Sequence, residues 1–326
     1  MAIIVYLIDY LCYIKKSTVP VKIIFLILPK VHLMDLAGPD QVFFEGIEYG
    51  ADLCIEYVTI GKSIITSAGL HLGTMKHFSE IKLTKGDFII IPGTQLSYFQ
   101  SIAYKSNTSL HQWIRNAYEL KVNICSICSG AFALAHIGIL KNKMCTTHWK
   151  RTGLLKELYP DIEVIENVLY TEDSGIYTSA GVASGIDLAL HILEQLYGKY
   201  FAHKVARELV IYKRRSGHQK QQSDLLEFRN HIHAGIHRVQ DWLQNNIHTK
   251  TSIEELAVVA HMSSRNFTRI FKKETGLTVH EYLQLLRLEK VKEWMFNPNI
   301  SKKQMAEKCG LKSERQINRI IQQIDQ

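Results

Sequence analysis

The sequence lacks the cysteine spacing of a metal site or of a disulfide-bonded protein. Its six cysteines include one C-x-x-C pair, Cys125 and Cys128, but no second pair that would complete a zinc site. No set of paired cysteines points to an oxidising compartment. We therefore expect no metal and no other cofactor, and a reduced protein in the cytoplasm.

The sequence also lacks a segment that would carry it into a membrane. Residues 1–14 are apolar, but Asp9 interrupts them and they are too short to cross a bilayer. They have neither the basic start nor the small-residue cleavage site of a signal peptide. We expect residues 1–20 to form an N-terminal extension, either poorly ordered or docked on the protein, and we expect no membrane partner.

An acidic excess is absent, and the basic excess is confined to one part of the chain. The net charge is +8. Residues 1–211 carry 19 basic and 19 acidic residues, whereas residues 212–326 carry 20 basic and 12 acidic residues. A basic surface can be a solvated face and nothing more. It can also replace the counterions condensed on DNA phosphates, and binding of that kind weakens steeply with salt.

A repeated pattern in the same basic region favours DNA binding. Residues 252–276 and 300–321 each combine a small residue where two helices cross, an apolar residue in a turn, and an i, i+3, i+4 apolar stripe. These are Ala257 and Ala306, Met262 and Leu311, and the stripes Phe267, Ile270, Phe271 and Ile317, Ile320, Ile321. The other face of each second helix is polar and basic, as a helix in a DNA major groove requires. The pattern predicts two helix-turn-helix motifs.

The first two-thirds of the chain alternates expected strands and helices. Residues 21–28 form a continuous apolar run, which is typical of a strand buried on both faces. Similar strands are expected at 54–60, 87–91 and 122–127, and helices at 110–120, 130–139, 186–197 and 200–212. Alternating elements of this kind predict an α/β sandwich with a mostly parallel sheet.

The length of 326 residues allows two domains. Residues 213–227 begin with a polar stretch that has no apolar stripe, so we assign them as a linker. Residues 21–212 then form the α/β domain. Residues 228–326 form an all-α domain, with expected helices at 231–245 and 280–296 beside the two motifs.

Residues 122–130 have the pattern of a strand, a sharp turn and a helix. The strand ends at Ile127, Cys128 lies on the turn and Gly130 begins the helix. Such an elbow presents one side chain at the carboxyl edge of the sheet. The helix N-terminus that follows would lower a thiol pKa and offer amide donors. A reactive Cys128 is one interpretation, and a buried, inert cysteine is the other.

Residues 228–326 resemble the AraC/XylS family of bacterial transcription regulators, most specifically over residues 257–278 and 282–295. The resemblance implies two helix-turn-helix units on one rigid bundle that enter successive major grooves of double-stranded DNA. It places base contacts at Arg265, Thr268 and Arg269 in the first unit, and at Glu314, Arg315, Asn318 and Arg319 in the second. Arginine can grip guanine with two bonds, and glutamate can accept from cytosine.

Phosphate contacts, which position the protein without reading bases, are expected at Ser263, Ser264, Lys272, Lys273 and Ser313. The second motif departs from the family because Gln316, Ile317 and Ile321 stand where aromatics are frequent. The chain also ends before the final helix that usually follows. We expect the first motif to dominate DNA binding.

Residues 21–212 resemble the PfpI-like domain of the class I glutamine-amidotransferase group, which implies a flavodoxin-like sandwich. The resemblance is narrower to the GlxA type, which joins this domain to an AraC-type reader. It rests on residues 34–43, 66–70, 91–93, 126–140, 146–149 and 178–194. Asp35 matches the acidic position that faces the elbow cysteine.

The sequence departs from the hydrolytic members of this group. Protease-like members have a histidine directly after the cysteine, where this chain has Ser129, and amidotransferases have a His-x-Glu, whereas His148 is followed by Trp149 and Lys150. The pair Asp35 and Cys128 does resemble the pair of isonitrile hydratases. Because a DNA reader is attached, we expect a sensor and not an enzyme.

The expected ligand pocket lies at the Cys128 elbow. Its candidate residues are Asp35, Gly93, Cys128, Ser129, His148, Ser179 and Gly181. Regulators of this kind often answer to amino-acid or quaternary-amine metabolites, so the resemblance implies a small-molecule effector of that type. PfpI-like domains commonly pair, which implies a homodimer on DNA. A cysteine-dependent hydratase or amidase and a thiol redox sensor are the alternatives.

Overall fold

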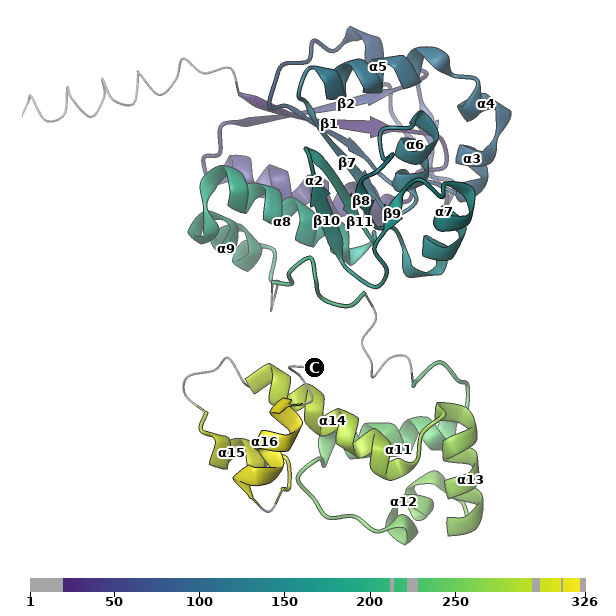
Figure 1. Cartoon of the computed structure of the whole chain (residues 1–326), viewed down its shortest axis with the longest axis vertical. Coiled ribbons are helices and arrows are strands. Elements are labelled where there is room, and N and C mark those ends of the chain that lie inside the picture. The colour runs from purple at the N-terminus through teal and green to yellow at the C-terminus, as the bar shows by residue number, and fades with distance from the viewer. Residues whose placement is uncertain (1–19, 212–213, 222–227, 295–299, 312, 323–326) are drawn as a thin grey trace, which may run out of the picture. The chain divides into compact units, whose positions relative to one another are not determined.

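The computed structural model describes residues 20–211, 214–221, 228–294, 300–311 and 313–322. The chain divides into two compact units, Met1–Gln221 and Gln222–Gln326 (Figure 1). The predicted N-terminal extension, apart from Pro20, and the side chain of Ile321 lie outside the described residues.

A seven-stranded sheet forms the centre of the first unit, in the order β10-β11-β7-β6-β1-β2-β5. Its strands are β1 (Val21–Ile27), β2 (Leu53–Thr59), β5 (Lys76–His77), β6 (Phe88–Ile91), β7 (Asn123–Ile127), β10 (Tyr170–Asp173) and β11 (Ile176–Ser179). Every pair is parallel except β10 with β11. The predicted mostly parallel sheet is therefore confirmed. Two short pairs lie outside it, β3 (Ile64–Ile65) with β4 (His71–Leu72) and β8 (Met144–Cys145) with β9 (Glu163–Val164).

Alternate side chains of the central strands fill two separate cores, because successive residues of a strand point to opposite faces. In β1, Ile24 and Leu26 belong to one core, and Ile23, Phe25 and Ile27 belong to the other. Burial on both faces explains why these strands read as continuous apolar runs. Helices cover both faces (Figure 1), which gives the predicted flavodoxin-like sandwich.

The helices over the first face are α3 (Leu96–Gln100), α4 (Ile102–Lys105), α5 (Thr108–Glu119), α6 (Gly130–Ile137) and α7 (Thr152–Leu158). Those over the second face are α2 (Leu33–Glu48), α8 (Ala183–Tyr197) and α9 (Lys199–Glu208). Two 3-10 turns, η2 (Phe78–Glu80) and η3 (Trp149–Arg151), complete the unit. The predicted helices occur within a few residues of their expected bounds.

The second unit is helical throughout its described part. Its helices are α11 (Ala234–Asn245), α12 (Ile253–Ala260), α13 (Ser264–Thr275), α14 (Val279–Trp294), α15 (Lys302–Lys308) and α16 (Glu314–Gln322). One core gathers α11 to α13 with Tyr282 and Leu286 of α14, and a second gathers α15 and α16 with Val291 of α14. Helix α14 therefore joins two small bundles, each of which holds one helix-turn-helix.

Part of the predicted linker lies against the first unit. Arg214 and Arg215 form ion pairs with Glu194 and Asp187 of α8. The backbone of Gly217 accepts a hydrogen bond of 2.8 Å from the backbone of Leu169. Residues 214–221 are thus attached to the α/β fold, whereas the boundary drawn at residue 213 remains a prediction.

Candidate functional site

The elbow at Cys128 has the geometry that the sequence pattern predicts. Strand β7 ends at Ile127, Cys128 has a φ of +54°, and α6 begins at Gly130. A positive φ costs energy for a residue with a side chain, so the surrounding structure must hold it. The backbone N–H of Cys128 donates to the carbonyl of Ser179 (2.9 Å), and the hydroxyl of Thr147 donates to the carbonyl of Cys128 (2.7 Å).

Two glycines allow neighbouring loops to close on this elbow. A Cβ atom on Gly181 would overlap the side chain of Cys128, and a Cβ atom on Gly93 would overlap the carboxylate of Asp35. Any larger residue at either position would push its loop away. The structure therefore brings Asp35, Gly93, Cys128 and Gly181 into one tight group.

Asp35 is the buried acid of this group. Its side chain is 1% exposed, and its Oδ1 accepts a hydrogen bond of 2.6 Å from the backbone N–H of Val182. Burial raises the pKa of Asp35, although the Val182 bond and the nearby His32 oppose that rise. Its carboxyl group lies beside the side chain of Cys128, which also opposes the rise.

The thiol of Cys128 does not have the lowered pKa that the sequence pattern led us to expect. Burial raises its pKa to about 12, and the charge of Asp35 adds to that rise, while the backbone N–H of Ser129 opposes it. Desolvation disfavours the thiolate more than the helix N-terminus favours it. Cys128 therefore stays protonated near neutral pH and can donate its S–H to Asp35.

Ser129 and Ser179 support the elbow. The Ser129 hydroxyl accepts from the backbone N–H of Thr94 (2.9 Å) and donates to the Thr94 carbonyl (2.7 Å), so it fixes the loop after β6. Ser179 is fully buried, and its carbonyl holds the N–H of Cys128. Its hydroxyl has no hydrogen-bond partner among the described residues.

A small hollow of about 160 Å³ lies next to this group. It is lined by His148, Trp149, Leu169, Ala180, Gly181, Val182, Ala183, Ser184, Arg215 and Gln221. Only His148 and Gly181 belong to the predicted pocket set, and Gly181 is also the residue in contact with Cys128. The other predicted pocket residues do not line it, namely Asp35, Gly93, Cys128, Ser129 and Ser179. Sequence reasoning missed Arg215 and Gln221, which stand in a polar stretch without any motif.

Two polar groups that line the hollow, the His148 ring and the Arg215 guanidinium, can donate hydrogen bonds. Nδ1 of His148 accepts from the backbone N–H of Lys150 (3.3 Å), and burial lowers the pKa of the ring, with Lys150 and Arg151 adding to that effect. The neutral ring therefore carries its proton on Nε2. The guanidinium of Arg215 bonds one oxygen of Asp187, which is 5% exposed. These donors suit a small ligand with an acceptor oxygen.

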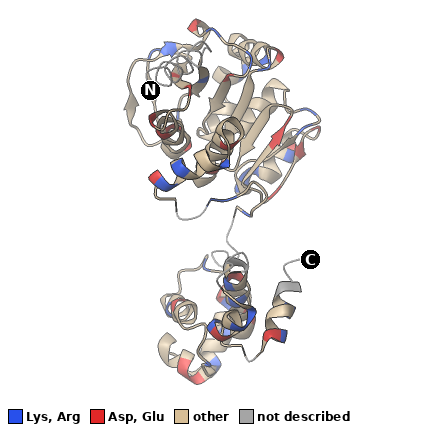
Figure 2. Ribbon diagram, turned by 90° about the vertical axis from the view of Figure 1, so that its left-hand side faces the viewer, with Lys and Arg blue, Asp and Glu red and all other residues tan. Residues whose placement is uncertain are grey.

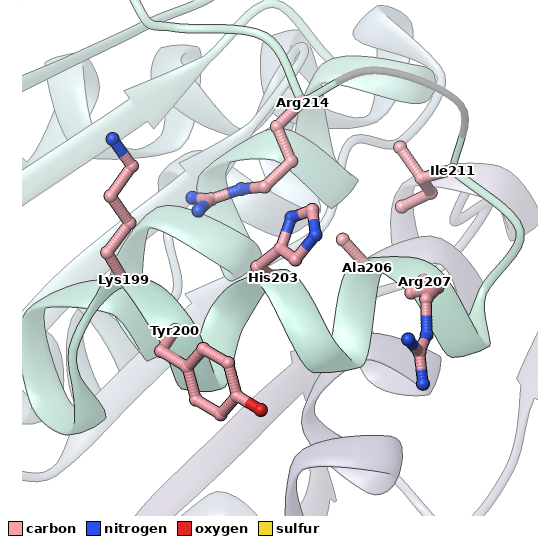
Figure 3. A pocket seen from close by; sticks show the side chains of 7 residues that line it. All are labelled: Lys199, Tyr200, His203, Ala206, Arg207, Ile211 and Arg214. Atoms are coloured by element: carbon pink, nitrogen blue, oxygen red, sulfur yellow. The ribbon is translucent and has the colours of Figure 1, made fainter.

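A larger groove of about 800 Å³ runs along α9, apart from the Cys128 group (Figure 3). Its lining residues are Lys199, Tyr200, His203, Ala206, Arg207, Ile211 and Arg214, none of which was predicted as a site residue. Tyr200 is 82% exposed, Ala206 and Ile211 are apolar lining residues, and the lining also includes the basic Lys199, Arg207 and Arg214.

In the helical unit, α13 separates its residues into two faces. Phe267 and Phe271 are fully buried. The predicted contacts Arg265, Thr268, Arg269, Lys272 and Lys273 are all exposed, and Ser264 is half-buried. Ser263 caps the helix by accepting from the backbone N–H of Asn266. Lys and Arg positions, blue on the ribbon of Figure 2, recur along the helices of this unit. The exposed basic residues of α13 therefore give it a cationic face opposite its packed one.

Helix α16 is arranged in the same way. Ile317 and Ile320 are buried, whereas the predicted contacts Ser313, Glu314, Arg315, Asn318 and Arg319 are exposed. Asn318 already accepts a hydrogen bond of 3.0 Å from Lys302. The sequence thus assigned the buried and exposed sides of both second helices correctly.

Within the described residues, no three His, Cys, Asp or Glu side chains are placed to hold a metal ion. The cysteines of the described part, Cys54, Cys125, Cys128, Cys145 and Cys309, are free. None of the helices that the structure describes is long and apolar enough to cross a bilayer.

Comparisons with known proteins match both units. Residues 21–195 match the model of the DJ-1/PfpI family, and residues 243–284 match the model of the bacterial regulatory helix-turn-helix proteins of the AraC family. The HTH-type transcriptional regulator CdhR of Pseudomonas aeruginosa is 24% identical over 90% of this chain and 86% of its own. The regulator GlxA of Rhizobium meliloti is 23% identical over 78% of this chain and 76% of its own.

Other matches cover less. The chain spans about half the length of the regulator GbdR of P. aeruginosa, with 25% identity over 58% of this chain and 51% of that protein. Isonitrile hydratase of Pseudomonas putida is 28% identical over 57% of this chain and 76% of its own. A solved AraC-family regulator from P. putida shares the fold of the first unit, with a TM-score of 0.51 and 19% identity over 58% of this chain and all of that one.

Proposed function

The chain belongs to the DJ-1/PfpI family, and since an AraC-type helix-turn-helix follows that domain, we propose that it is a sequence-specific transcription regulator controlled by a small molecule. The observation that carries the proposal is the exposed cationic face of α13 on a capped and packed helix. Relatives named as transcriptional regulators, such as CdhR and GlxA, support it. A protein that binds genomic DNA in a bacterium works in the cytoplasm.

DNA recognition is assigned mainly to the first motif. Arg265 and Arg269 are exposed on α13 and are long enough to reach guanine in the major groove, with Thr268 between them. Lys272 and Lys273 are placed for phosphates, which position the helix. On α16, Glu314, Arg315 and Arg319 would read bases in the next major groove. A homodimer would bind two copies of this site.

Control is assigned to the hollow beside Cys128. Its volume of about 160 Å³ suits a small metabolite, and the His148 ring and the Arg215 guanidinium offer donors to a carboxylate. The indole of Trp149 forms part of the same wall and could meet an amine or quaternary-amine group. We therefore assign an effector of the amino-acid or quaternary-amine type.

The test is a footprint on the chain's own upstream DNA, with and without a panel of small carboxylates and amines. We expect protection in successive major grooves on one face of the helix, lost steeply as salt rises, and a change in affinity with at least one compound. Protection without any sequence preference would contradict specific recognition. Protection that no compound changes would contradict control by the hollow.

A second function, a cysteine-dependent hydratase, is favoured by the position of Asp35 beside Cys128. The likeness to isonitrile hydratase also fits it. The raised pKa of Cys128 weighs against a thiolate nucleophile, and equally against a thiol redox sensor. Cys128→Ala separates these functions. A sensor keeps ligand-dependent DNA binding, an enzyme loses isonitrile hydration, and a redox sensor loses any response of DNA affinity to peroxide.

A further inference from the structure

Residues 214–221, which we call the strap, form one side of the hollow. Arg215 and Gln221 line it together with His148, Trp149 and the first residues of α8. Gln221 is also the last residue of the α/β unit, and the next described residue, Phe228, belongs to the helical unit. The strap is therefore both a wall of the hollow and the final part of the sensor fold before the chain continues to the DNA-binding unit.

The beginning of the strap is held by α8. Arg214 pairs with Glu194 (2.6 Å), and Arg215 reaches the buried Asp187 through Nε (3.0 Å) and a terminal nitrogen (2.5 Å). Burial raises the pKa of Asp187, and the bond to Arg215 is the largest effect that opposes this rise. Because α8 starts at the hollow, this end of the strap is tied to a helix whose N-terminus a ligand would touch.

The middle of the strap passes close to the backbone beside β10. The carbonyl of Gly217 accepts from the N–H of Leu169 (2.8 Å), and a Cβ atom on Gly217 would overlap the carbonyl and ring of Tyr170. Only glycine allows this approach. The strap is thus seated along its length and does not cross the hollow as a free loop.

The end of the strap is held by the side chain of Gln221. Its Nε2 donates to the carbonyls of Thr147 (3.0 Å) and Val168 (2.9 Å), and its Oε1 accepts from the backbone N–H of Trp149 (2.8 Å). Its own backbone N–H donates to Asn167 (3.1 Å). The side-chain amide therefore joins residues 147–149 to the backbone of Val168, which adjoins the lining residue Leu169.

We propose that Gln221 is the positioning residue that transmits the state of the hollow to the DNA-binding unit, an inference that rests on the function proposed above. A ligand that moves the His148–Trp149 wall must carry Gln221 with it or break its bonds. Occupied and empty hollows then favour different positions of the chain at residue 221. The difference in ligand affinity between the two positions sets how far DNA affinity can change.

In the test, an enlarged side chain takes the place of a ligand in the hollow. Ala183 lines it and is exposed, so Ala183→Leu adds apolar volume there without a foreign ligand. DNA affinity is measured by titration on the chain's own upstream DNA for the full chain, Ala183→Leu, Gln221→Ala and the double variant. We expect Ala183→Leu to change the Kd by about fivefold or more, within the usual range of coupling between sites, and to change it by less than about twofold when Gln221 is alanine.

Two further variants keep the result interpretable. Gln219→Ala alters an exposed glutamine of the same strap and must leave the Ala183→Leu effect intact. Gln221→Glu keeps the size of the side chain but places an oxygen opposite the two carbonyls that Nε2 now bonds. It must therefore reduce the Ala183→Leu effect on DNA affinity as Gln221→Ala does. Circular dichroism checks that each variant folds. If the effect of Ala183→Leu persists in both Gln221 variants, Gln221 does not transmit the signal, although control by the hollow stands. If Ala183→Leu has no effect in any background, control by the hollow fails, and the inference fails with it.

Discussion

The two helix-turn-helix motifs begin in the same way but are packed against different cores. Helix α12 starts with a capping box of Ser252 and Glu255, and α15 starts with one of Ser301 and Gln304. Each box satisfies two backbone N–H groups that would otherwise lack partners. Both motifs therefore have the capping sequence that starts a helix.

Within the described residues, the cores behind the two motifs differ in their fully buried side chains. In the first, Phe267 and Phe271 meet edge to face with ring centroids 5.7 Å apart, and Phe271 meets Tyr282 at 5.6 Å. In the second, among the described residues, the fully buried side chains include the aliphatic Ile317 and Val291, and the half-buried Trp294 packs against them. Aromatic side chains bury more area and pack with defined geometry. Two motifs with the same helix start can therefore differ in stability.

The largest expected effect tests that difference directly. Phe267→Ala should destabilise the first motif by about 3–5 kcal/mol, because a fully buried aromatic leaves a cavity. Ile317→Ala should cost less, about 2–3 kcal/mol, at the low end of the range for a large aliphatic residue. Urea unfolding followed by circular dichroism measures both, with the exposed Val258→Ala as the matched control. Equal losses would mean that the two cores are equivalent.

DNA contacts provide the next comparison. Arg269→Ala should cost about 1–3 kcal/mol of specific binding, which relaxes the preference for the upstream site, while Arg319→Ala should cost less. Gel-shift titrations against specific and scrambled DNA measure both. Lys272→Ala serves as a phosphate control, since it should weaken binding to both DNAs alike. The reverse order of the two arginines would show that the second motif dominates.

Much of this comparison could be predicted from the sequence, because it depends on local patterns. The apolar stripes of α13 and α16, which contain Phe267 and Ile317, predicted which face of each helix is buried. Continuous apolar runs such as residues 21–28 predicted the strands of a parallel sheet. The turn at Cys128 was predicted because a buried strand ends at Ile127 and a helix begins at Gly130. Each of these signals lies within a few residues of the feature it predicts.

The candidate site was less accessible to sequence reasoning, because its properties depend on residues far apart in the chain. The pKa of Cys128 is set by burial and by Asp35, which lies more than ninety residues earlier, so the helix N-terminus alone predicted the wrong direction. Gln221 reaches the hollow across 74 residues to Thr147 and 53 residues to Val168. A polar residue in a polar stretch gives no sign of such contacts.

The turns inside the motifs carry a smaller expected effect. His261 and Gly310 both have a positive φ, of +57° and +64°. A Cβ atom on Gly310 would overlap the carbonyl of His248, so Gly310→Ala should cost more than about 1 kcal/mol. His261→Gly removes the strain of a side chain on a left-handed backbone, but it also raises the conformational entropy of the unfolded chain. The two effects oppose each other, so stability should change by less than about 1 kcal/mol. Thermal unfolding distinguishes them, and a tolerated Gly310→Ala would show that the second turn is loosely held.

The capping boxes give the smallest effect and test the shared half of the comparison. Ser252→Ala and Ser301→Ala should each cost about 1 kcal/mol, because each hydroxyl accepts from a backbone N–H at 3.2 Å. Ser252→Asp and Ser301→Asp should restore most of the loss, since aspartate caps as well as serine does. Urea unfolding of the full chain measures all four variants. If only Ser252→Ala destabilises the protein, the Ser301 cap contributes no stability to the second motif. The two motifs then differ at their helix starts as well as in their cores.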